Sequence, residues 1–300
     1  MLIASSPLVF VHLFHGLVLC LLGVSLLLLA RLVFTRTTAL DPSAELIDHT
    51  NSAYGIYLGG FLAGTAIALA GTLFGRQAEP LLPALGNMLC EGLLLIALLR
   101  LSISINDRLI LFGFSLAREI SEDHNRGAAF CVGGSCLAGG LILNGALTGY
   151  SSGLFLALRD TILLWVIGQI ILVVGALLYR RLADFDIHQL IQFDDNAAAG
   201  LRFGTYLAAL GLVLRGALVR APMIDLKLHG PQTLLLALGG LLTFVILYPF
   251  GRQLTLLGQS SEEEVDMHGN MAVSLVDAAV TLSIALLVAF AIQRVPVDVS

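Results

Sequence analysis

The sequence predicts an all-α polytopic membrane protein, and three observations carry that prediction: an excess of apolar residues, eight long apolar windows and an internal repeat. Of the 300 residues, 57% are hydrophobic, 31 are glycine and only 12% are charged. Soluble domains carry about 25% charged residues, so a water-soluble globule of this size could not bury the apolar surface. The composition also excludes a disordered chain and, with a net charge of −5, a basic nucleic-acid binder.

The cysteines and the N-terminal segment agree with this class. Cys20, Cys90, Cys131 and Cys136 lie in apolar runs without CxxC or CxxH spacing, so we expect packed thiols rather than a disulfide or metal set. The first apolar run, 8–33, lacks a preceding cationic segment and is too long for a signal-peptide core. It is the first predicted span.

Eight windows contain the roughly 20 apolar residues that a helix needs to cross a bilayer. They are 8–33, 52–74, 84–105, 127–149, 154–179, 197–219, 233–257 and 270–293. No alternating barrel pattern is present, so helices are the expected spanning structure. Residues 109–120 are predicted to form an interfacial helix after the third span. Prolines and glycines mark the boundaries, namely Pro7, Pro80, Pro83, Gly149, Gly153, Pro222, Pro231 and Pro296.

The basic residues favour one orientation. Eight arginines follow the odd-numbered spans, namely Arg31, Arg36, Arg108, Arg118, Arg126, Arg180, Arg181 and Arg252. Five basic residues lie on the opposite side, namely Arg76, Arg159, Arg220, Lys227 and Arg294. The positive-inside rule therefore places the first set in the cytoplasm and both termini outside it.

An internal repeat is the most informative feature of the chain. Asn51, Asn125, Asn196 and Asn270 open the four even-numbered spans, at separations of 74, 71 and 74 residues. Asparagine is a good helix N-cap. Small residues recur at fixed distances after each asparagine, and four-residue spacing lets another helix approach closely. The predicted packing glycines are Gly55, Gly59, Gly133, Gly200 and Gly204.

The repeat predicts the architecture. Each repeat has two spans, so all four repeats should share one orientation and be related by rotation about the membrane normal, not by inversion. The even-numbered helices are expected to be inner helices and the Leu-rich odd-numbered ones outer helices. The two halves are predicted to be four-helix units, 1–150 and 151–300.

Several of these residues form a recognisable pattern. It consists of Glu119, His124, Asn125, Ala138–Gly140 and Asn144 in the second repeat, and Asn51 and Gly71–Gly75 in the first. The pattern resembles the YjfL-like family of bacterial inner-membrane proteins (domain of unknown function 350), and the chain looks like two family units fused in tandem. Asp195 and Gly269 depart from it, since the family favours His or Asn there. The resemblance implies an inner-membrane location and an association with envelope stress, but no activity or catalytic residues.

Two charged residues lie within the predicted spans at matched depth. Arg202 and Asp277 follow Asn196 and Asn270 by six and seven residues, which puts both about 10 Å inside the boundary. Equal depth on neighbouring helices predicts an ion pair. It is either a structural clasp between repeats 3 and 4 or, with Asp277 as the working group, part of a cation or proton path.

The third span carries further polar candidates. Glu91 and Arg100 lie within it, and Asp107 lies at its end. Arg100 and Asp107 share a helix face with Ser104, which predicts an intrahelical network. These residues provide either bundle-facing polarity or a pore or ligand site. Arg215, near the outer end of the sixth span, is expected to snorkel.

The residues before each asparagine form a second candidate site. His49, His124 and His268, with neighbouring aspartates, would gather at a cytoplasmic mouth if the repeats surrounded one axis. Such ligands suit a divalent metal, but no HExxH motif or i,i+4 His pair is present. Helix capping is therefore the favoured interpretation, and the sequence predicts no metal and no cofactor. Glu262–Glu264 is either a solvated link or a docking site for a basic or polyamine-like partner.

Three functional hypotheses remain. The first is a non-enzymatic membrane scaffold or envelope-stress component whose acidic links engage a cytoplasmic protein partner. The second is a channel or carrier for a small cationic solute, which would use Glu91, Asp277 and the mouth. The third, an intramembrane enzyme, is disfavoured because no nucleophile–base pair is visible. Expected partners are the lipid bilayer and a second copy in a homo-oligomer, with no nucleic acid.

Overall fold

The structure is a computed structural model that describes residues 6–38, 40–74, 79–111, 116–148, 153–183, 186–219, 226–256 and 260–295. Within these residues it is all helical, and eight helices are long and apolar enough to cross a membrane. They are α1 (Ser6–Thr38), α2 (Ser52–Leu73), α3 (Leu81–Leu109), α5 (Arg126–Leu147), α6 (Leu154–Leu182), α8 (Ala197–Leu218), α9 (Leu226–Thr255) and α10 (Met271–Ile292). The prediction of an eight-helix membrane protein is confirmed.

Four short segments precede the asparagine-capped helices. They are η1 (Ala44–Asp48), α4 (Leu116–Ser121), α7 (Ile187–Gln192) and η2 (Glu263–Met267). The interfacial helix expected over 109–120 is therefore α4, which starts later and ends one residue later; 112–115 lie outside the described residues. The other three segments were not predicted, because one or two helical turns show no apolar periodicity.

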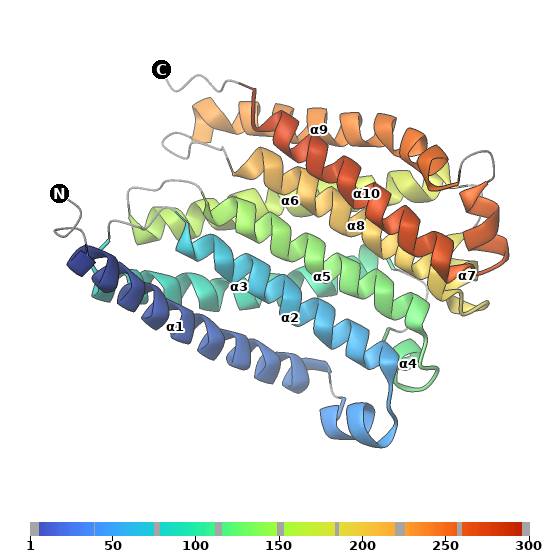
Figure 1. Ribbon diagram of the computed structural model, residues 1–300, viewed down its shortest axis with the longest axis horizontal. Coiled ribbons are helices and arrows are strands. Elements are labelled where there is room, and N and C mark those ends of the chain that lie inside the picture. Colours follow the sequence, from blue (N-terminus) through green and yellow to red (C-terminus); the bar gives the residue numbers. More distant parts are fainter. Residues whose placement is uncertain are drawn as a thin grey trace.

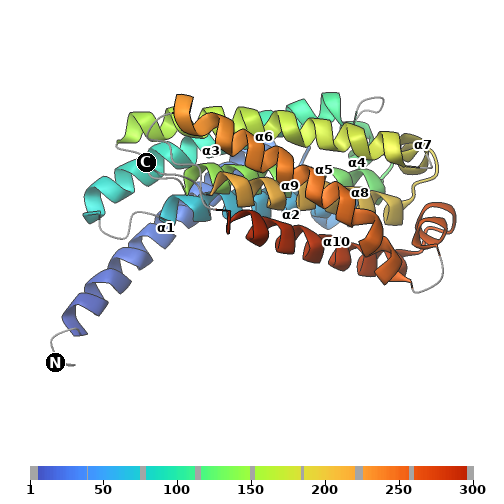
Figure 2. The ribbon, with the colours of Figure 1, turned by 90° about the horizontal axis from the view of Figure 1, so that it is seen from above.

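The long helices form a row with a second layer behind it. Helices α2, α5, α8 and α10 pack in that order, which we call the row, and α3, α6 and α9 lie behind it (Figures 1 and 2). Helix α1 packs against α2 and α3 beside the first edge of the row. All four row helices begin at the same end of the bundle, beside the short segments (Figure 1). We call this end the cap end.

The ends of the row differ from its centre. In the most apolar window, 83% of α5 and of α8 is buried, against 50% of α2 and 39% of α10. The expectation that every even-numbered span is an inner helix holds for α5 and α8 and is wrong for α2 and α10. The reason is that each end helix has a row neighbour on one side only.

Glycines allow backbone-to-backbone contact inside the row. A Cβ atom on Gly204 would overlap the carbonyl of Phe130, and one on Gly200 would overlap Gly127. Across the α2–α5 contact, a Cβ on Gly133 would lie 3.4 Å from the Ile56 carbonyl oxygen. The close packing expected at Gly55 and Gly59 does not occur. A Cβ on Gly55 would meet only Leu46, at 3.9 Å, and one on Gly59 would meet nothing within 4 Å.

Proline is not a boundary everywhere that we expected. Pro231 lies inside α9, as does Pro249. Membrane helices tolerate proline because neighbouring groups satisfy the freed backbone carbonyls. Pro222 lies outside the described residues. The four cysteines are free thiols, of which Cys131 and Cys136 are buried.

Candidate functional site

Each repeat asparagine caps the helix that it precedes. The Oδ1 atom accepts a hydrogen bond from the backbone N–H three residues later, at 3.1 Å for Asn51, 2.9 Å for Asn125, 2.9 Å for Asn196 and 3.2 Å for Asn270. Such a bond satisfies one of the four N–H groups that the first helical turn leaves free. The bonds accepted by the asparagine Oδ1 atoms are therefore local to each repeat.

The bonds donated by the Nδ2 atoms of three of these asparagines join successive repeats. The Asn51 Nδ2 donates to the carbonyl of Ile120, 2.7 Å away in α4. The Asn125 Nδ2 donates in the same way to Ile191 in α7 at 2.6 Å, and Asn196 to Val265 in η2 at 2.9 Å. Each asparagine therefore ties its own helix to the short segment of the next repeat. Sequence reasoning found the caps but missed these bonds, because their partners lie 66–69 residues away.

The residue before each asparagine has a left-handed backbone. The φ angles are 48° at Thr50, 50° at His124, 47° at Asp195 and 60° at Gly269. Only glycine adopts this region without steric cost. The turn between each short segment and its row helix thus has the same shape in all four repeats, although only one of them uses glycine.

The row separates the histidines that a ring of repeats would have gathered. His49 and His124 lie together, with their ring centroids 6.2 Å apart. His268 lies in the fourth repeat, with its Nδ1 3.5 Å from Glu264 Oε1. Segments η1 and η2 lie at opposite ends of the row (Figure 1). The axial mouth therefore does not form, and the polar residues follow the cap end of the row.

A buried carboxylate lies at the contact between the second and third repeats. Burial raises the pKa of Glu119, and the charges of Asp123 and Asp195 raise it further, while the hydrogen bond from Asn125 lowers it. That bond joins Asn125 Nδ2 to Glu119 Oε2 at 2.9 Å. Glu45 and Glu264 accept equivalent bonds from Asn51 and Asn270.

Arg202 lies at the centre of a charge network between the third and fourth repeats. Its Nε donates to Asp277 Oδ2 at 2.9 Å, and its Nη1 donates to Asp266 Oδ2 at 3.0 Å. Its Nη2 donates to the Ser261 carbonyl at 2.5 Å. Arg202 and Asp277 are 3% and 1% exposed. The matched depths in the sequence therefore correspond to a direct, buried ion pair.

A cavity of about 250 Å³ adjoins this network. It is lined by Tyr179, Tyr206 and Tyr248, whose rings contact one another, and by Arg202 and Asp266. Burial raises the pKa of Asp266, although Arg202 and Arg252 lower it. The cavity thus combines aromatic surface with charges that largely neutralise one another.

The first unit has a cavity of about 170 Å³ at the matching place, lined by Tyr57, Arg100, Ser104 and Asp107. The expected side-chain network between Arg100 and Asp107 is not present among the described contacts. Instead, Ser104 Oγ donates to the Arg100 carbonyl at 3.2 Å, and the Arg100 guanidinium lies 6.0 Å from the centroid of the Phe34 ring.

Glu91 does not belong to either cavity. It is a buried residue in the interior of α3, 2% exposed. It lies nine residues before Arg100 in the same helix and does not line the cavity of Arg100. The structure therefore places Glu91 apart from the other polar candidates.

Three further hydrogen bonds join the long helices. Asn144 Nδ2 donates to the Ile67 carbonyl at 2.7 Å, and Arg215 Nε donates to Asn144 Oδ1 at 2.6 Å. Arg215 therefore bridges α8 to α5, and its expected snorkelling stays a prediction. The Trp165 Nε1 donates to Ser102 Oγ at 2.8 Å.

A similar contact centres on Asn106, which donates to Ser135 at 2.6 Å and accepts from Gln169. Sequence reasoning missed Gln169 in this group, and it also missed the bond from Trp165 to Ser102. A glutamine inside an otherwise apolar span was the available signal.

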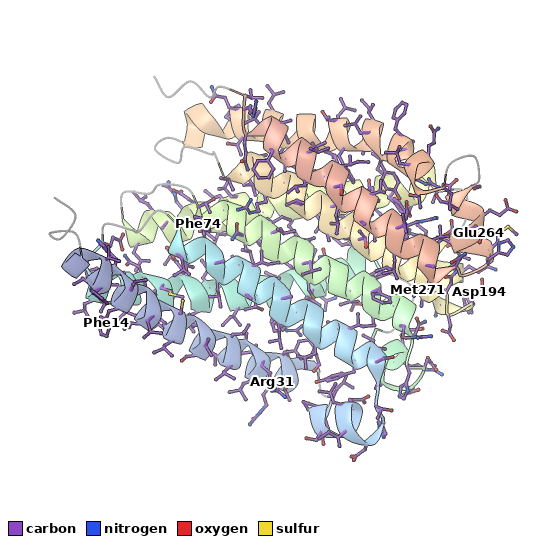
Figure 3. The ribbon with its side chains drawn as sticks, in the orientation of Figure 1. Phe14, Arg31, Phe74, Asp194, Glu264 and Met271 are labelled. Atoms are coloured by element: carbon purple, nitrogen blue, oxygen red, sulfur yellow. The ribbon has the colours of Figure 1, made fainter. Side chains whose placement is uncertain are left out.

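The acidic run of η2 is largely bound to its own protein. Glu262 forms an ion pair with Arg252, and Glu264 accepts from Asn270 at 2.9 Å. Only Glu263 is an exposed member of the run. Figure 3 shows Glu264 and Asp194 at the cap end, far from Phe14 and Phe74.

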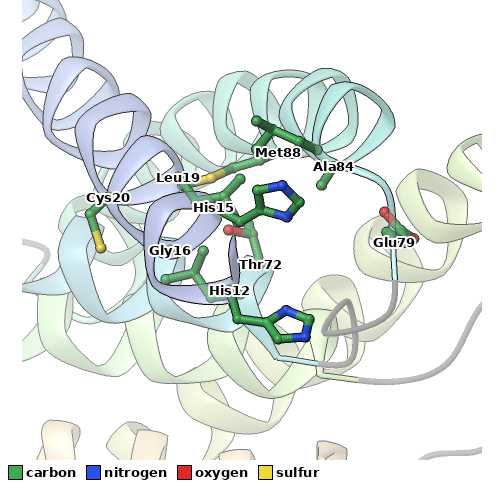
Figure 4. Close-up of a pocket in the computed structure, with 11 residues that line it drawn as sticks. His12, His15, Gly16, Leu19, Cys20, Thr72, Glu79, Ala84 and Met88 are labelled. Atoms are coloured by element: carbon green, nitrogen blue, oxygen red, sulfur yellow. The ribbon is translucent and has the colours of Figure 1, made fainter. Parts of the chain in front are cut away.

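A cavity of about 470 Å³, larger than the two above, lies at the other end of the bundle between α1, α2 and α3. His12, His15 and Glu79 lie on its wall, together with apolar groups such as Met88 (Figure 4). It is remote from the asparagine caps of the repeat, and of the described residues named individually in the sequence analysis only Cys20 lines it.

These features define a multi-pass helical membrane protein that contains an internal repeat. The chain belongs to the family described as Domain of Unknown Function (DUF350), whose model matches residues 8–147 and 152–292. The two matches are tandem copies, so the prediction of two fused family units is confirmed. No curated protein and no solved structure matches the chain.

Proposed function

We propose that this protein is a non-enzymatic membrane scaffold that presents the cap end of its row to a cytoplasmic protein partner. The four repeats serve as units that share one orientation across the membrane. The envelope-stress role implied by the family resemblance in the sequence, and a location in the bacterial inner membrane, are part of the same proposal.

The packing of the row is the observation that carries the proposal. The backbones of α5 and α8 are in direct contact: Gly134 lies so close to Gly204 that a Cβ atom on Gly134 would overlap it. The same holds between α2 and α5, where Gly140 lies against Gly64. Helices packed this closely do not deform continuously. The row therefore holds the cap end as a rigid surface.

Exposed acidic residues make the surface of the cap end negatively charged. Asp48, Asp123, Asp194, Asp195 and Glu263 are all exposed near the starts of the row helices. The asparagine bonds between repeats fix the segments that carry them. A partner with a basic surface fits this arrangement, because complementary charge steers association.

The proposal is tested by crosslinking in intact cells. A photoreactive residue at Asp123 or Asp194 should form an adduct with the same cytoplasmic protein, whereas one at Arg294, at the opposite end, should not. The purified partner should bind the detergent-solubilised chain and lose affinity for the variant Asp123→Asn/Asp194→Asn/Asp195→Asn. Equal affinity for that variant, or the same adduct from Arg294, would overturn the proposal.

The orientation has its own test. A single cysteine placed at the exposed Glu263, in a variant without the native cysteines, should resist an impermeant thiol reagent in intact cells and react after lysis. Ser261 is a poor position for the label because it is buried and its carbonyl accepts from Arg202. Labelling in intact cells would place the cap end outside the cytoplasm.

A carrier for a small cationic solute is the second candidate, and the buried Asp277 favours it. Its carboxylate is bound by Arg202 and by Thr255, whose Oγ1 donates at 3.1 Å. A cation would have to displace this arginine. Proteoliposomes holding the protein should show no K⁺ or polyamine flux above empty vesicles; flux that Asp277→Asn abolishes would favour the carrier.

A further inference from the structure

The first and second repeats meet at the cap end through three side chains that metal ions commonly use as ligands. Glu45 lies in η1, His49 follows it, and His124 lies just before the cap of α5. One ligand atom of each lies within 4.8 Å of those of the other two. We propose that Glu45, His49 and His124 bind one divalent transition-metal ion of the zinc class. The proposal does not depend on the scaffold role.

The distances fit a site that closes around an ion. The Nδ1 atom of His49 lies 3.9 Å from Glu45 Oε2, which is too long for a hydrogen bond. Two ligands on a tetrahedral zinc ion, each with a bond of about 2.0–2.1 Å, lie roughly 3.4 Å apart. Both histidines are exposed, so their imidazoles have room to rotate toward that separation.

The carboxylate is already oriented by a neighbour. Asn51 Nδ2 donates to Glu45 Oε2 at 2.7 Å, and the same nitrogen donates to the Ile120 carbonyl. Glu45 is buried, at 6% exposed. Groups that hold a ligand in place in this way raise metal affinity, because less conformational freedom is lost when the ion binds.

The backbone at His124 brings the second imidazole to the site. Its φ angle is 50°, in the left-handed region, and the matching residue of the fourth repeat is Gly269 at 60°. A glycine would relieve the steric cost at His124 but would remove the ligand. The second repeat therefore retains an imidazole where the local backbone favours glycine.

The other contacts between repeats lack this ligand set. At the second contact the matching residues are Glu119, Asp123 and Asp195, which are all carboxylates. At the third they are Leu190, Asp194 and Gly269. Imidazole ligands select zinc, copper or nickel over calcium and magnesium. Within the part of the chain that the structure describes, only the first contact combines two imidazoles with a carboxylate.

The test is metal binding by the full-length protein in detergent. Cys20 and Cys90 are exposed thiols, so both are replaced by serine in the parent. The chelator-treated parent should bind one equivalent of Zn²⁺ by calorimetry, and Co²⁺ should give visible d–d bands without thiolate charge transfer. His49→Ala and His124→Ala should each weaken Zn²⁺ binding by at least about tenfold. Ca²⁺ and Mg²⁺ should not compete.

His268→Ala is the matched control. His268 and Glu264 form the same i,i+4 pair as His49 and Glu45, but no following repeat supplies a third ligand. We therefore expect unchanged Zn²⁺ affinity and stoichiometry in this variant. The proposal is overturned if the parent binds no Zn²⁺ at micromolar concentrations, if His124→Ala binds as tightly as the parent, or if His268→Ala loses as much affinity as His49→Ala.

Discussion

The two halves of the chain place the same kinds of residues at matching positions but use them differently. Gly59 and Gly204 lie 145 residues apart at the same point of the repeat, yet Gly59 faces open space and Gly204 lies against the backbone of α5. In both halves a polar cavity adjoins the cap end: Arg100 of α3 lines the first, whereas Arg202 of α8 and Arg252 of α9 line the second. The same repeat position therefore has a different role at the edge of the row and in its interior.

Arg202 and Arg100 differ in the partners that their guanidinium groups have. Arg202 has carboxylates at two of its nitrogens. The Nε and Nη1 atoms of Arg100 are buried without a hydrogen-bond partner among the described residues. In the first half, Val132 occupies the position that matches Asp277, so the first unit has no carboxylate at that position. The second unit thus depends on its charge pair in a way that the first does not.

The largest expected effect is at that pair. Asp277→Leu or Arg202→Met alone should lower the free energy of unfolding by about 3–5 kcal/mol, because the remaining charge stays buried without its partner. Arg100→Met should cost less than about 1 kcal/mol, since it orphans no carboxylate. Unfolding in detergent, followed by circular dichroism, measures all three.

The double variant Arg202→Met/Asp277→Leu is the control for this prediction. It should recover much of the loss, because neither charge remains in the apolar interior. Additive losses from the two substitutions, or a cost for Arg100→Met equal to that for Arg202→Met, would contradict the difference between the halves.

The next largest effect on stability is expected at Gly204 and Gly59, which occupy matching positions of the repeat. Gly204→Ala should destabilise the protein by about 1–3 kcal/mol, because the added methyl overlaps the Phe130 carbonyl. Gly59→Ala should stabilise it by up to about 1 kcal/mol, since alanine favours a helix and the space is open. Melting temperatures of the two variants should shift in opposite directions; shifts of the same sign would show that both glycines pack alike.

The repeat asparagines should differ by a smaller amount. Asn125→Ala removes the helix cap, the bond to Glu119 and the bond to the Ile191 carbonyl in the next repeat. Asn270→Ala removes a cap and the bond to Glu264 but no described bond to a later repeat. We expect Asn125→Ala to cost about 1 kcal/mol more, which is the contribution of one hydrogen bond. Equal losses would mean that the bond between repeats adds nothing.

The smallest effect is a pH dependence at Glu119. Its folded-state pKa lies above the usual 4.5, mainly because of burial. The folded state therefore holds this proton more tightly than the unfolded state, so the contribution is full below pH 4.5 and is lost as the pH rises through the folded-state pKa. Glu119→Gln should remove this decline while keeping an acceptor for Asn125.

Unfolding free energies of wild type and Glu119→Gln, measured from pH 4 upward, should diverge as the pH rises. A constant difference between wild type and Glu119→Gln across the range would remove Glu119 as the source.

By itself the sequence determined the properties that depend on neighbouring residues. Helix length, apolar composition and N-cap chemistry are local, so the spans lie near their predicted ranges and Asn51, Asn125, Asn196 and Asn270 cap the helices that they open. The 145-residue offset between matching asparagines also indicated two fused units, because tandem copies repeat the same spacing in both halves.

The tertiary structure alone decided which of the equivalent positions meet. A repeat pattern is the same whether its units form a ring or a row, because it encodes each unit's faces but not the presence of a neighbour on each face. The row leaves Gly59 open and buries Gly204. It also pairs Arg215 with Asn144 and brings His49 to His124 while leaving His268 at the far end. The first and last repeats each lack one neighbour, so equivalent repeat positions there have different packing.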